Sequence, residues 1–436
     1  MHIGLFPGAE NVFKPRRPPA DPEQAPVRLV AGVNGGGNPA LEAEPAPAPP
    51  NGKYPIDVAL EYLAKAQPLF TPEWTAWKAA MRPPKLAGTW ALSGYQMGKG
   101  KIYGLMTVAA TSAPDEFDTK VELYYATTGA KLARAGKGIV YTGYSWRGRQ
   151  KAGAKPSGSA DPGTEPAEWR EAMMVSRDNN SMEGRWFWGG YDEFGMDVAL
   201  TRVSMQPVVL GVDLFALQSP STKEMRIYGA NLPAALKPSD VDLGPGIRVK
   251  RIVKAAPTAA TVEVETAPGL MAGLRDVSIA GATAVKAITI YDKIACVRVA
   301  PSRVMSRLGG TMSSKQYAQF EAIAYAAGPD GKPDTEDDLP LGPVAAAWSL
   351  EEFYSTPDDD DIEYVGAVND SGLFTPSVEG PNPKRKKASN NYPTNNWGDV
   401  WVNATYREGD KTLKGRAYLV VTIPLYVRYD QPEVTK

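Results

Sequence analysis

Only one cysteine and one histidine are available for side-chain chemistry in this chain of 436 residues. The histidine is His2, beside Met1, and the cysteine is Cys296. A nucleophile–histidine relay needs an imidazole beside the nucleophile, and a structural zinc site needs about four cysteine or histidine ligands. A covalent haem needs a CxxCH motif, which a single cysteine cannot form. The sequence therefore assigns no catalytic, cofactor-binding or metal-binding residue, and it favours a function carried by shape and surface.

Two acidic stretches are the remaining candidates for metal binding. Asp330–Asp338 places five carboxylates in a loop that contains glycine and proline, and carboxylates are the ligands that calcium prefers. The spacing of an EF-hand is absent, so we favour a solvated hairpin loop. Asp358–Asp361, followed by Glu363, is likewise interpreted as a solvated turn. Calcium binding remains the alternative at both places.

The other reactive or charged features have simple interpretations. Cys296 opens the strand-like run Ile294–Val299 and is expected to be a small core residue. The basic run Lys384–Lys387 could contact an acidic partner. With a net charge of −1, the chain is not expected to bind nucleic acid. The spacing of Gly98, Gly100 and Gly104 predicts a hairpin turn, because no helix follows to form a phosphate site.

Aromatic residues cluster in two segments and are candidates for contacts with another molecule. Side chains alternate across a strand, so Trp186 and Trp188 should face one side and Phe187 the other. Aromatic residues on both faces favour core packing or a covered interface over a ligand platform. The candidates for an interface are Tyr144, Trp146, Trp186, Trp188 and Tyr191.

The elements that position these residues are mostly strands. Charged residues make up 22% and hydrophobic residues 43%, which is normal for a protein with a core. Residues 1–53 read as an irregular extension, and residues 54–85 as short helices over Pro55–Ala66 and from Thr71, the second with Trp74 and Trp77. No apolar run reaches the roughly 18 residues that span a membrane.

From Leu86 onward the pattern predicts an all-β protein. Short alternating runs separated by turn residues predict an antiparallel β-barrel-like domain over 86–205. Two further units, 206–292 and 293–436, have the size of immunoglobulin-like β-sandwiches. The expected barrel strands are Gly88–Ser93, Lys101–Ala109, Thr119–Tyr125, Gly138–Tyr144, Ala172–Val175, Met182–Trp188 and Met196–Val203.

Three sets of sequence blocks rich in aromatic residues and glycine are distinctive. They are Leu86–Trp90 with Gly98–Val108, Tyr141–Gly148 with Met182–Asp192, and Gln319–Tyr325 with Trp348–Glu352 and Gly398–Val402. These blocks resemble the α subunit of quinohemoprotein amine dehydrogenase, in the domains that follow its dihaem cytochrome domain. The resemblance extends from about Tyr54 to Asp430.

This resemblance implies a periplasmic complex that oxidises primary amines. In the family, a small subunit carries a tryptophan-derived quinone, a β-propeller subunit supports it, and the α subunit carries two haems c in its first domain. The present sequence departs from the family because it has no CxxCH motif. Met1–Pro7 is similar to the end of that haem domain. The sequence is therefore expected either to start inside a longer protein or to come from a lineage that lost the haems. No signal peptide is visible in it.

The predicted function is the non-catalytic β-domain portion of an amine dehydrogenase α subunit, which acts in assembly and subunit contact. Its partners, by resemblance, are the β-propeller subunit and the small quinone-bearing subunit, with no nucleic acid. One alternative is a secreted carbohydrate- or protein-binding β-domain protein without a redox role. A weaker one is a hydrolase that uses carboxylates on the barrel.

Overall fold

The computed structural model describes Pro72 and residues 84–141, 144–152, 166–310, 314–353, 359–385 and 395–423. The predicted extension 1–53 lies outside the described residues, and so do the predicted helices apart from Pro72. Nearly all regular structure in the described part is β, which confirms the predicted fold class. No described helix is long and apolar enough to cross a membrane.

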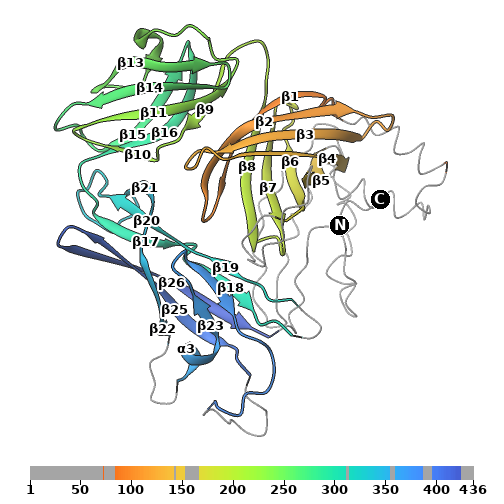
Figure 1. The fold of residues 1–436 in the computed structure, drawn as a ribbon, viewed down its shortest axis with the longest axis vertical. Coiled ribbons are helices and arrows are strands. Elements are labelled where there is room, and N and C mark those ends of the chain that lie inside the picture. The colour runs from red at the N-terminus through yellow and green to blue at the C-terminus, as the bar shows by residue number, and fades with distance from the viewer. Residues whose placement is uncertain are drawn as a thin grey trace, which may run out of the picture. The chain divides into compact units, whose positions relative to one another are not determined.

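The first eight strands form a closed barrel in which each strand is antiparallel to the next and β8 closes on β1 (Figure 1). The strands are β1 (Gly88–Gln96), β2 (Gly100–Ala110), β3 (Glu116–Tyr125), β4 (Lys131–Tyr141), β5 (Ser145–Ala152), β6 (Glu168–Val175), β7 (Ser181–Trp188) and β8 (Phe194–Arg202). Closure pairs every strand on both edges and leaves none exposed. The predicted hairpin at Gly98 is confirmed, because Gln96 pairs with Gly100 across the turn.

The barrel interior is filled by large aromatic side chains. Trp90, Trp146, Trp169 and Trp186 are completely buried there, and Trp188 nearly so. Small residues on neighbouring strands make room for this volume. A β-carbon at Gly138 would collide with the ring of Trp146, and one at Gly148 would collide with the carboxylate of Glu171. Glycine at these two positions is therefore a packing requirement.

Strand β5 was not among the strands expected from the sequence. Its outward side chains include Arg147, Arg149 and Lys151, and its inward positions after Trp146 are Gly148, Gln150 and Ala152. Strands are predicted from apolar residues that alternate with polar ones. Beyond Trp146 the inward residues of β5 are not large and apolar, so this signal is missing. The strand forms because its backbone pairs with β4 and β6 on either side.

The middle domain consists of two four-stranded sheets around one core. One sheet has the order β10-β16-β15-β12 and the other β13-β14-β11-β9. The strands are β9 (Val208–Val212), β10 (Ala216–Gln218), β11 (Ser221–Ala230), β12 (Val241–Asp242), β13 (Ile247–Ala256), β14 (Ala259–Thr266), β15 (Gly273–Ile279) and β16 (Ala282–Tyr291). Val and Ile side chains from both sheets are buried between them, as in a two-layer sandwich.

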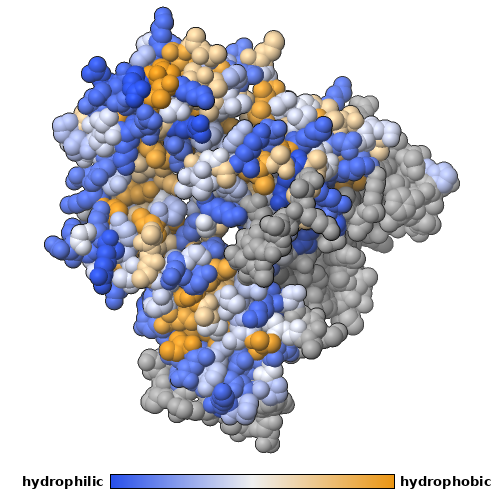
Figure 2. Space-filling model, in the orientation of Figure 1, coloured by the Kyte–Doolittle hydropathy of each residue, from blue (hydrophilic) through white to orange (hydrophobic). Residues whose placement is uncertain are grey.

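The C-terminal domain packs three sheets around another core. Their orders are β17-β20-β21, β18-β26-β25-β22 and β19-β24-β23, and β18 is parallel to β26. The elements are β17 (Cys296–Ala300), β18 (Arg303–Arg307), β19 (Ala318–Gln319), β20 (Glu321–Ala326), β21 (Leu339–Val344), β22 (Ala347–Glu352), α3 (Asp361–Tyr364), β23 (Gly366–Val368), β24 (Leu373–Pro376), β25 (Gly398–Glu408) and β26 (Lys411–Thr422). On the visible face of the molecule, hydrophobic residues form separate patches among hydrophilic ones (Figure 2).

Two side chains of β2 tie the barrel to the middle domain. The Lys101 ammonium donates hydrogen bonds to the carbonyls of Val212 at 3.1 Å and Leu214 at 2.7 Å. It also lies 4.5 Å from the centre of the Phe215 ring. The Tyr103 hydroxyl donates to the same Val212 carbonyl at 3.0 Å. Burial lowers the pKa of Lys101 to about 8, because loss of solvent disfavours the charged ammonium.

Candidate functional site

A cleft of about 340 Å³ lies where one end of the barrel meets the C-terminal domain. The barrel contributes the turn between β1 and β2 and the turn between β7 and β8, and the other wall comes from β18, β19 and the turn before β24. Aromatic rings and amide side chains both line it, which is the usual composition of a small-molecule site. Its polar groups decide what it can do.

Beside the cleft, a buried carboxylate joins the two domains. Glu321, at the start of β20, accepts a hydrogen bond from the Tyr95 hydroxyl at 2.5 Å and another from the Gly98 amide at 2.6 Å. Only 7% of Glu321 is exposed, and burial raises the pKa of its carboxyl. Gly98 has φ +80°, and a β-carbon there would lie 3.2 Å from Gln319. Glycine therefore allows the turn to approach Glu321 closely.

A second carboxylate bridges the same domains from the turn between β7 and β8. Glu193 accepts hydrogen bonds from the Gly190 amide at 2.7 Å, within its own turn, and from the Tyr317 amide at 2.9 Å, in the C-terminal domain. The Tyr317 ring also lies 5.8 Å from that of Phe194. The buried Glu321 and the partly buried Glu193, together with the aromatic contact, join the barrel to the C-terminal domain.

The remaining polar groups of the cleft are also engaged. Asn369 Oδ1 accepts from the Ser371 and Leu373 amides at 3.0 Å each, and Gln319 Nε2 donates to the Ser371 carbonyl at 2.7 Å. Arg185 pairs with Asp197 at 2.8 Å. Because these acceptors already hold structural hydrogen bonds, the cleft has the character of a rigid joint between domains.

The five interface candidates divide into buried and partly exposed residues. Trp146, Trp186 and Trp188 point into the barrel, as their burial and membership of its core show. The predicted alternation is correct, since Phe187 lies on the outer side and packs against Tyr191 with ring centres 5.1 Å apart. Tyr144 and Tyr191 are partly exposed. The three tryptophans therefore serve the barrel core, and only the two tyrosines keep exposed area for a partner.

A polar cluster inside the barrel was not anticipated from the sequence. The Glu171 carboxylate accepts hydrogen bonds from Trp146 Nε1 at 2.6 Å and from Gln150 Nε2 at 2.9 Å. Gln150 Nε2 also donates to Thr119 Oγ1 at 2.7 Å, while Gln150 Oε1 has no hydrogen-bond partner. Burial raises the pKa of Glu171 to about 7. An isolated Glu in a strand pattern looks like a surface residue, so only barrel closure identifies this one as internal.

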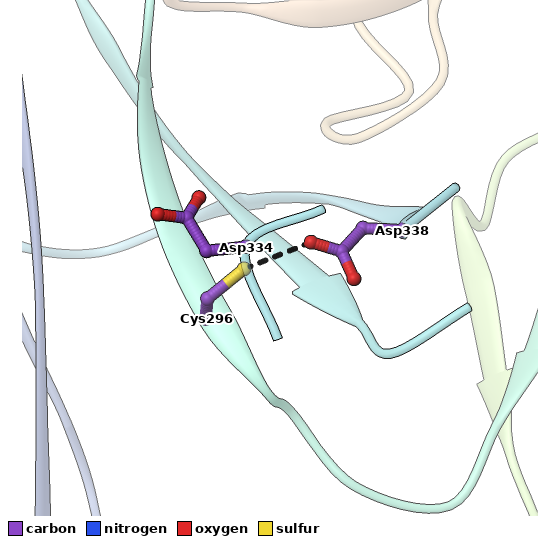
Figure 3. A group of neighbouring side chains, drawn as sticks. All are labelled: Cys296, Asp334 and Asp338. Atoms are coloured by element: carbon purple, nitrogen blue, oxygen red, sulfur yellow. Dashed lines mark hydrogen bonds between the residues drawn. The ribbon is translucent and has the colours of Figure 1, made fainter. Parts of the chain in front are cut away.

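The acidic loop 330–338 folds against β17, where Arg298 hydrogen-bonds to it. Figure 3 shows the side chains of Cys296, Asp334 and Asp338 beside one another at this point. Cys296, Asp334 and Asp338 lie close enough together for a shared metal ion. Arg298, however, donates to Asp334 Oδ1 at 3.0 Å and to Asp338 Oδ2. The Cys296 thiol lies 3.5 Å from Asp338 Oδ2 and is partly exposed, so the expectation of a core cysteine is wrong. A guanidinium already supplies the positive charge that a cation would bring.

A second arginine was misinterpreted as part of a surface basic run. Arg385 is 8% exposed and pairs with Asp360 at 2.8 Å and with Asp361. It also donates to the carbonyls of Asn395 at 2.9 Å and Trp397 at 2.6 Å. Lys386 and Lys387 lie outside the described residues, as does Asp358. Asp361 also approaches Glu352 and Asp359, although this acidic group is partly neutralised by Arg385.

The described residues do not fit a covalently attached haem. A c-type haem needs two cysteines of a CxxCH motif, and the single cysteine of this sequence lies in β17 beside Arg298 and Asp338. Burial raises the pKa of the Cys296 thiol, which works against a reactive thiolate. No electron-transfer step follows from the residues present.

Comparison with known families gives three consecutive matches. Models of quinohemoprotein amine dehydrogenase α subunit domains II, III and IV match residues 83–203, 206–292 and 297–434. These matches cover most of the chain and agree with the three groups of strands. Comparison with curated proteins finds no match.

Solved structures offer only distant likenesses. A redesigned β-barrel matches with 15% identity and a TM-score of 0.22, over 29% of this chain and 96% of its own. Human protocadherin-24 EC1-2 matches with 13% identity and a TM-score of 0.18, over 52% and 98%. A SusE-like surface located polysaccharide binding protein from the Bacteroides thetaiotaomicron heparin utilisation locus matches with 10% identity and a TM-score of 0.15, over 78% and 50%. These scores carry no argument about function.

Proposed function

This chain belongs to the quinohemoprotein amine dehydrogenase α-subunit family, and from that premise we propose that it acts as a structural, non-catalytic part of an amine dehydrogenase complex. The observation that carries the proposal is the unbroken succession of α-subunit domains II, III and IV along the chain. In this proposal, the chain contacts a β-propeller subunit and a small quinone-bearing subunit in the periplasm. Amine oxidation belongs to the assembled complex.

The way in which the domains are joined supports a scaffold. The barrel and the middle domain are linked by Lys101 and Tyr103, which donate hydrogen bonds to backbone carbonyls of the middle domain. The barrel and the C-terminal domain are linked by Glu321 and Glu193. Hydrogen bonds of this kind are costly to break, because a buried acceptor would lose its donor. Domains held in this way can present partner surfaces at a constant spacing.

The two carboxylates at the junction between the barrel and the C-terminal domain also support a non-catalytic role. General acid–base catalysis needs a group that is free to exchange a proton with a substrate. Glu321 and Glu193 instead hold backbone amides across the domain junction. The scaffold proposal accounts for both carboxylates without assigning them a reaction.

Co-expression with the two proposed partner subunits tests this function. We expect the chain to co-purify with the β-propeller and quinone-bearing subunits in a fixed ratio. We also expect the purified chain alone to reduce no redox dye when a primary amine is added. Dye reduction by the chain alone would contradict the non-catalytic role. Failure of the co-expressed subunits to bind the chain would contradict the assembly role.

A further inference from the structure

The outer face of the sheet β18-β26-β25-β22 combines aromatic and apolar residues at positions that do not face the domain core. Along β25 and β26, residues such as Val400 and Leu419 are buried in the core, whereas their neighbours point the other way. The outward set forms what we call the outer aromatic face. Its members are Met305, Phe353, Trp401, Tyr418 and Val420.

The aromatic side chains of this face pack on one another. Trp401 and Tyr418 are directly opposite across β25 and β26, with ring centres 5.9 Å apart. Phe353 lies 5.2 Å from the Trp401 ring and 4.8 Å from the Tyr418 ring. Phe353 is 38% exposed and Met305 46% exposed, so the face keeps solvent-accessible apolar area. Aromatic residues in such a position are typical centres of protein–protein contacts.

Exposed cations surround the aromatic centre. Arg416 lies over the Trp401 ring, with its guanidinium carbon 4.1 Å from the ring centre. Arg303 is opposite Tyr418 on β18, and Lys414 is on β26. None of these three exposed cations has an ion pair with a described residue. Two carboxylates on the same face already accept hydrogen bonds. Asp399 accepts one from the Tyr418 hydroxyl and Glu351 accepts one from Asn403 Nδ2, each at 2.9 Å.

The ring geometry favours a protein over a polysaccharide as the occupant. A sugar stacks on the open face of a ring, and an extended glycan needs rings that lie roughly coplanar. Here the rings meet at 43° for Phe353 and Trp401, 60° for Phe353 and Tyr418, and 69° for Trp401 and Tyr418. Arg416 also covers one face of Trp401. An aromatic centre with an arginine beside it instead matches the residue types that dominate protein interfaces.

We propose that the outer aromatic face docks a partner subunit whose contact surface presents carboxylates around an apolar centre. Carboxylates of the partner would pair with Arg303, Arg416 and Lys414, and its apolar residues would cover Phe353 and Trp401. This inference rests on the proposed scaffold function, because it assigns one face of the chain to a subunit contact. It adds the location and the charge of that contact.

The test measures binding of the full chain to the co-expressed pair of β-propeller and quinone-bearing subunits. The main variant carries Arg303→Glu and Arg416→Glu, which reverse charge at exposed positions and leave the core unchanged. A second variant, Trp401→Ala, removes the aromatic centre. The matched control carries Arg248→Glu and Lys254→Glu, which make the same charge change at exposed positions of β13. Thermal unfolding of each chain alone shows whether the fold is kept.

We expect the double reversal to weaken binding at least about tenfold at low salt, because unlike charges across the contact become like charges. Binding of the unmodified chain should weaken as sodium chloride rises, and this dependence should be smaller in the variant. The control should bind as the unmodified chain does. Trp401→Ala should also weaken binding about tenfold or more.

Three results would overturn the inference. If the subunit pair binds the unmodified chain and both face variants equally, the scaffold function stands and the outer aromatic face is not the contact. If the pair does not bind the unmodified chain at all, the proposed function fails together with the inference. If Trp401→Ala abolishes binding of a soluble polysaccharide and leaves subunit binding unchanged, the face is a glycan site.

Discussion

Replacing Glu171 by glutamine should stabilise the protein at high pH and have little effect at low pH. In the barrel interior, the Glu171 carboxylate accepts from Trp146 and Gln150, and Gln150 Oε1 has no partner. A glutamine at position 171 would keep its carbonyl oxygen for Trp146 and point its amide toward Gln150. If the Gln150 amide then rotates by 180°, its Oε1 can accept hydrogen bonds from the new side-chain amide at position 171 and from the Thr119 hydroxyl. The neutral side chain therefore satisfies the cluster without a buried charge.

The magnitude follows from the shift in the pKa of Glu171. Its value rises from 4.5 to about 7 on burial. Because the folded pKa is the higher one, the native state binds more protons than the unfolded state between these values. Stability therefore falls as pH rises from 4.5 to 7 and then levels off. The difference of about 2.5 units, at about 1.4 kcal/mol per unit, corresponds to about 3 kcal/mol.

Urea unfolding followed by tryptophan fluorescence at pH 5 and pH 8 measures this effect, since five tryptophans lie in the barrel core. Relative to the unmodified chain, Glu171→Gln should gain about 3 kcal/mol at pH 8 and under 1 kcal/mol at pH 5. Glu183→Gln, an exposed change on β7, is the control and should show no pH-dependent gain. A gain that is the same at both pH values, or a loss at pH 8, would refute the reasoning.

Three other changes test the domain junctions and the buried arginine. Glu321→Ala should lower the free energy of unfolding by about 2–4 kcal/mol in urea titrations, because the Tyr95 hydroxyl and the Gly98 amide both lose their acceptor. Glu321→Gln keeps one acceptor oxygen and should lower the free energy of unfolding by less. Burial lowers the pKa of Lys101 from 10.5 to about 8 in the folded state. Between pH 8 and pH 10.5 the unfolded state therefore binds more protons than the folded state, so stability should rise with pH across this range. Lys101→Met should abolish that rise, and an unchanged slope would assign it elsewhere. Arg385→Ala should lower the free energy of unfolding by about 3–5 kcal/mol in melting experiments, because it leaves the buried carboxylates of Asp360 and Asp361 without their cation. Arg385→Lys keeps the charge and should lose less stability, and the remaining loss would measure the contribution of the guanidinium geometry.

Much of the fold could be predicted because the strands alternate. In β3, every second residue from Phe117 to Tyr125 is buried, so the sequence alone indicates a strand with one face in a core. Strand β5 shows the limit of this approach. Its inward positions after Trp146 hold glycine, glutamine and alanine. At Gly148 a β-carbon would collide with Glu171 of β6 and approach Trp146, so packing inside the closed barrel requires this small residue.

The candidate sites were harder to predict than the strands. The alternation of Trp186, Phe187 and Trp188 was correctly predicted, since it depends only on strand geometry. The junction at Glu321 joins residues 226 positions apart, and no local pattern marks it. Arg385 appeared to belong to a basic surface run because its partners, Asp360 and Asp361, lie at the start of α3, about 25 positions earlier in the chain. Charge in a sequence indicates a surface unless the fold supplies an opposite charge inside.

The sequence by itself determined the all-β class and, in the strands that were correctly predicted, which residues share a face. These properties follow from local sterics, the two-residue period of strands and the distinctive aromatic and glycine blocks. Only the tertiary structure decided which of the two faces became a core, which carboxylates became buried and which aromatic residues stayed accessible. Closure of the barrel buried Trp186 and Glu171, while the outer face of β25 and β26 left Trp401 beside Arg416, which has no ion pair with the residues that the structure describes. Burial depends on what packs against a face, and that is set by residues distant in the chain.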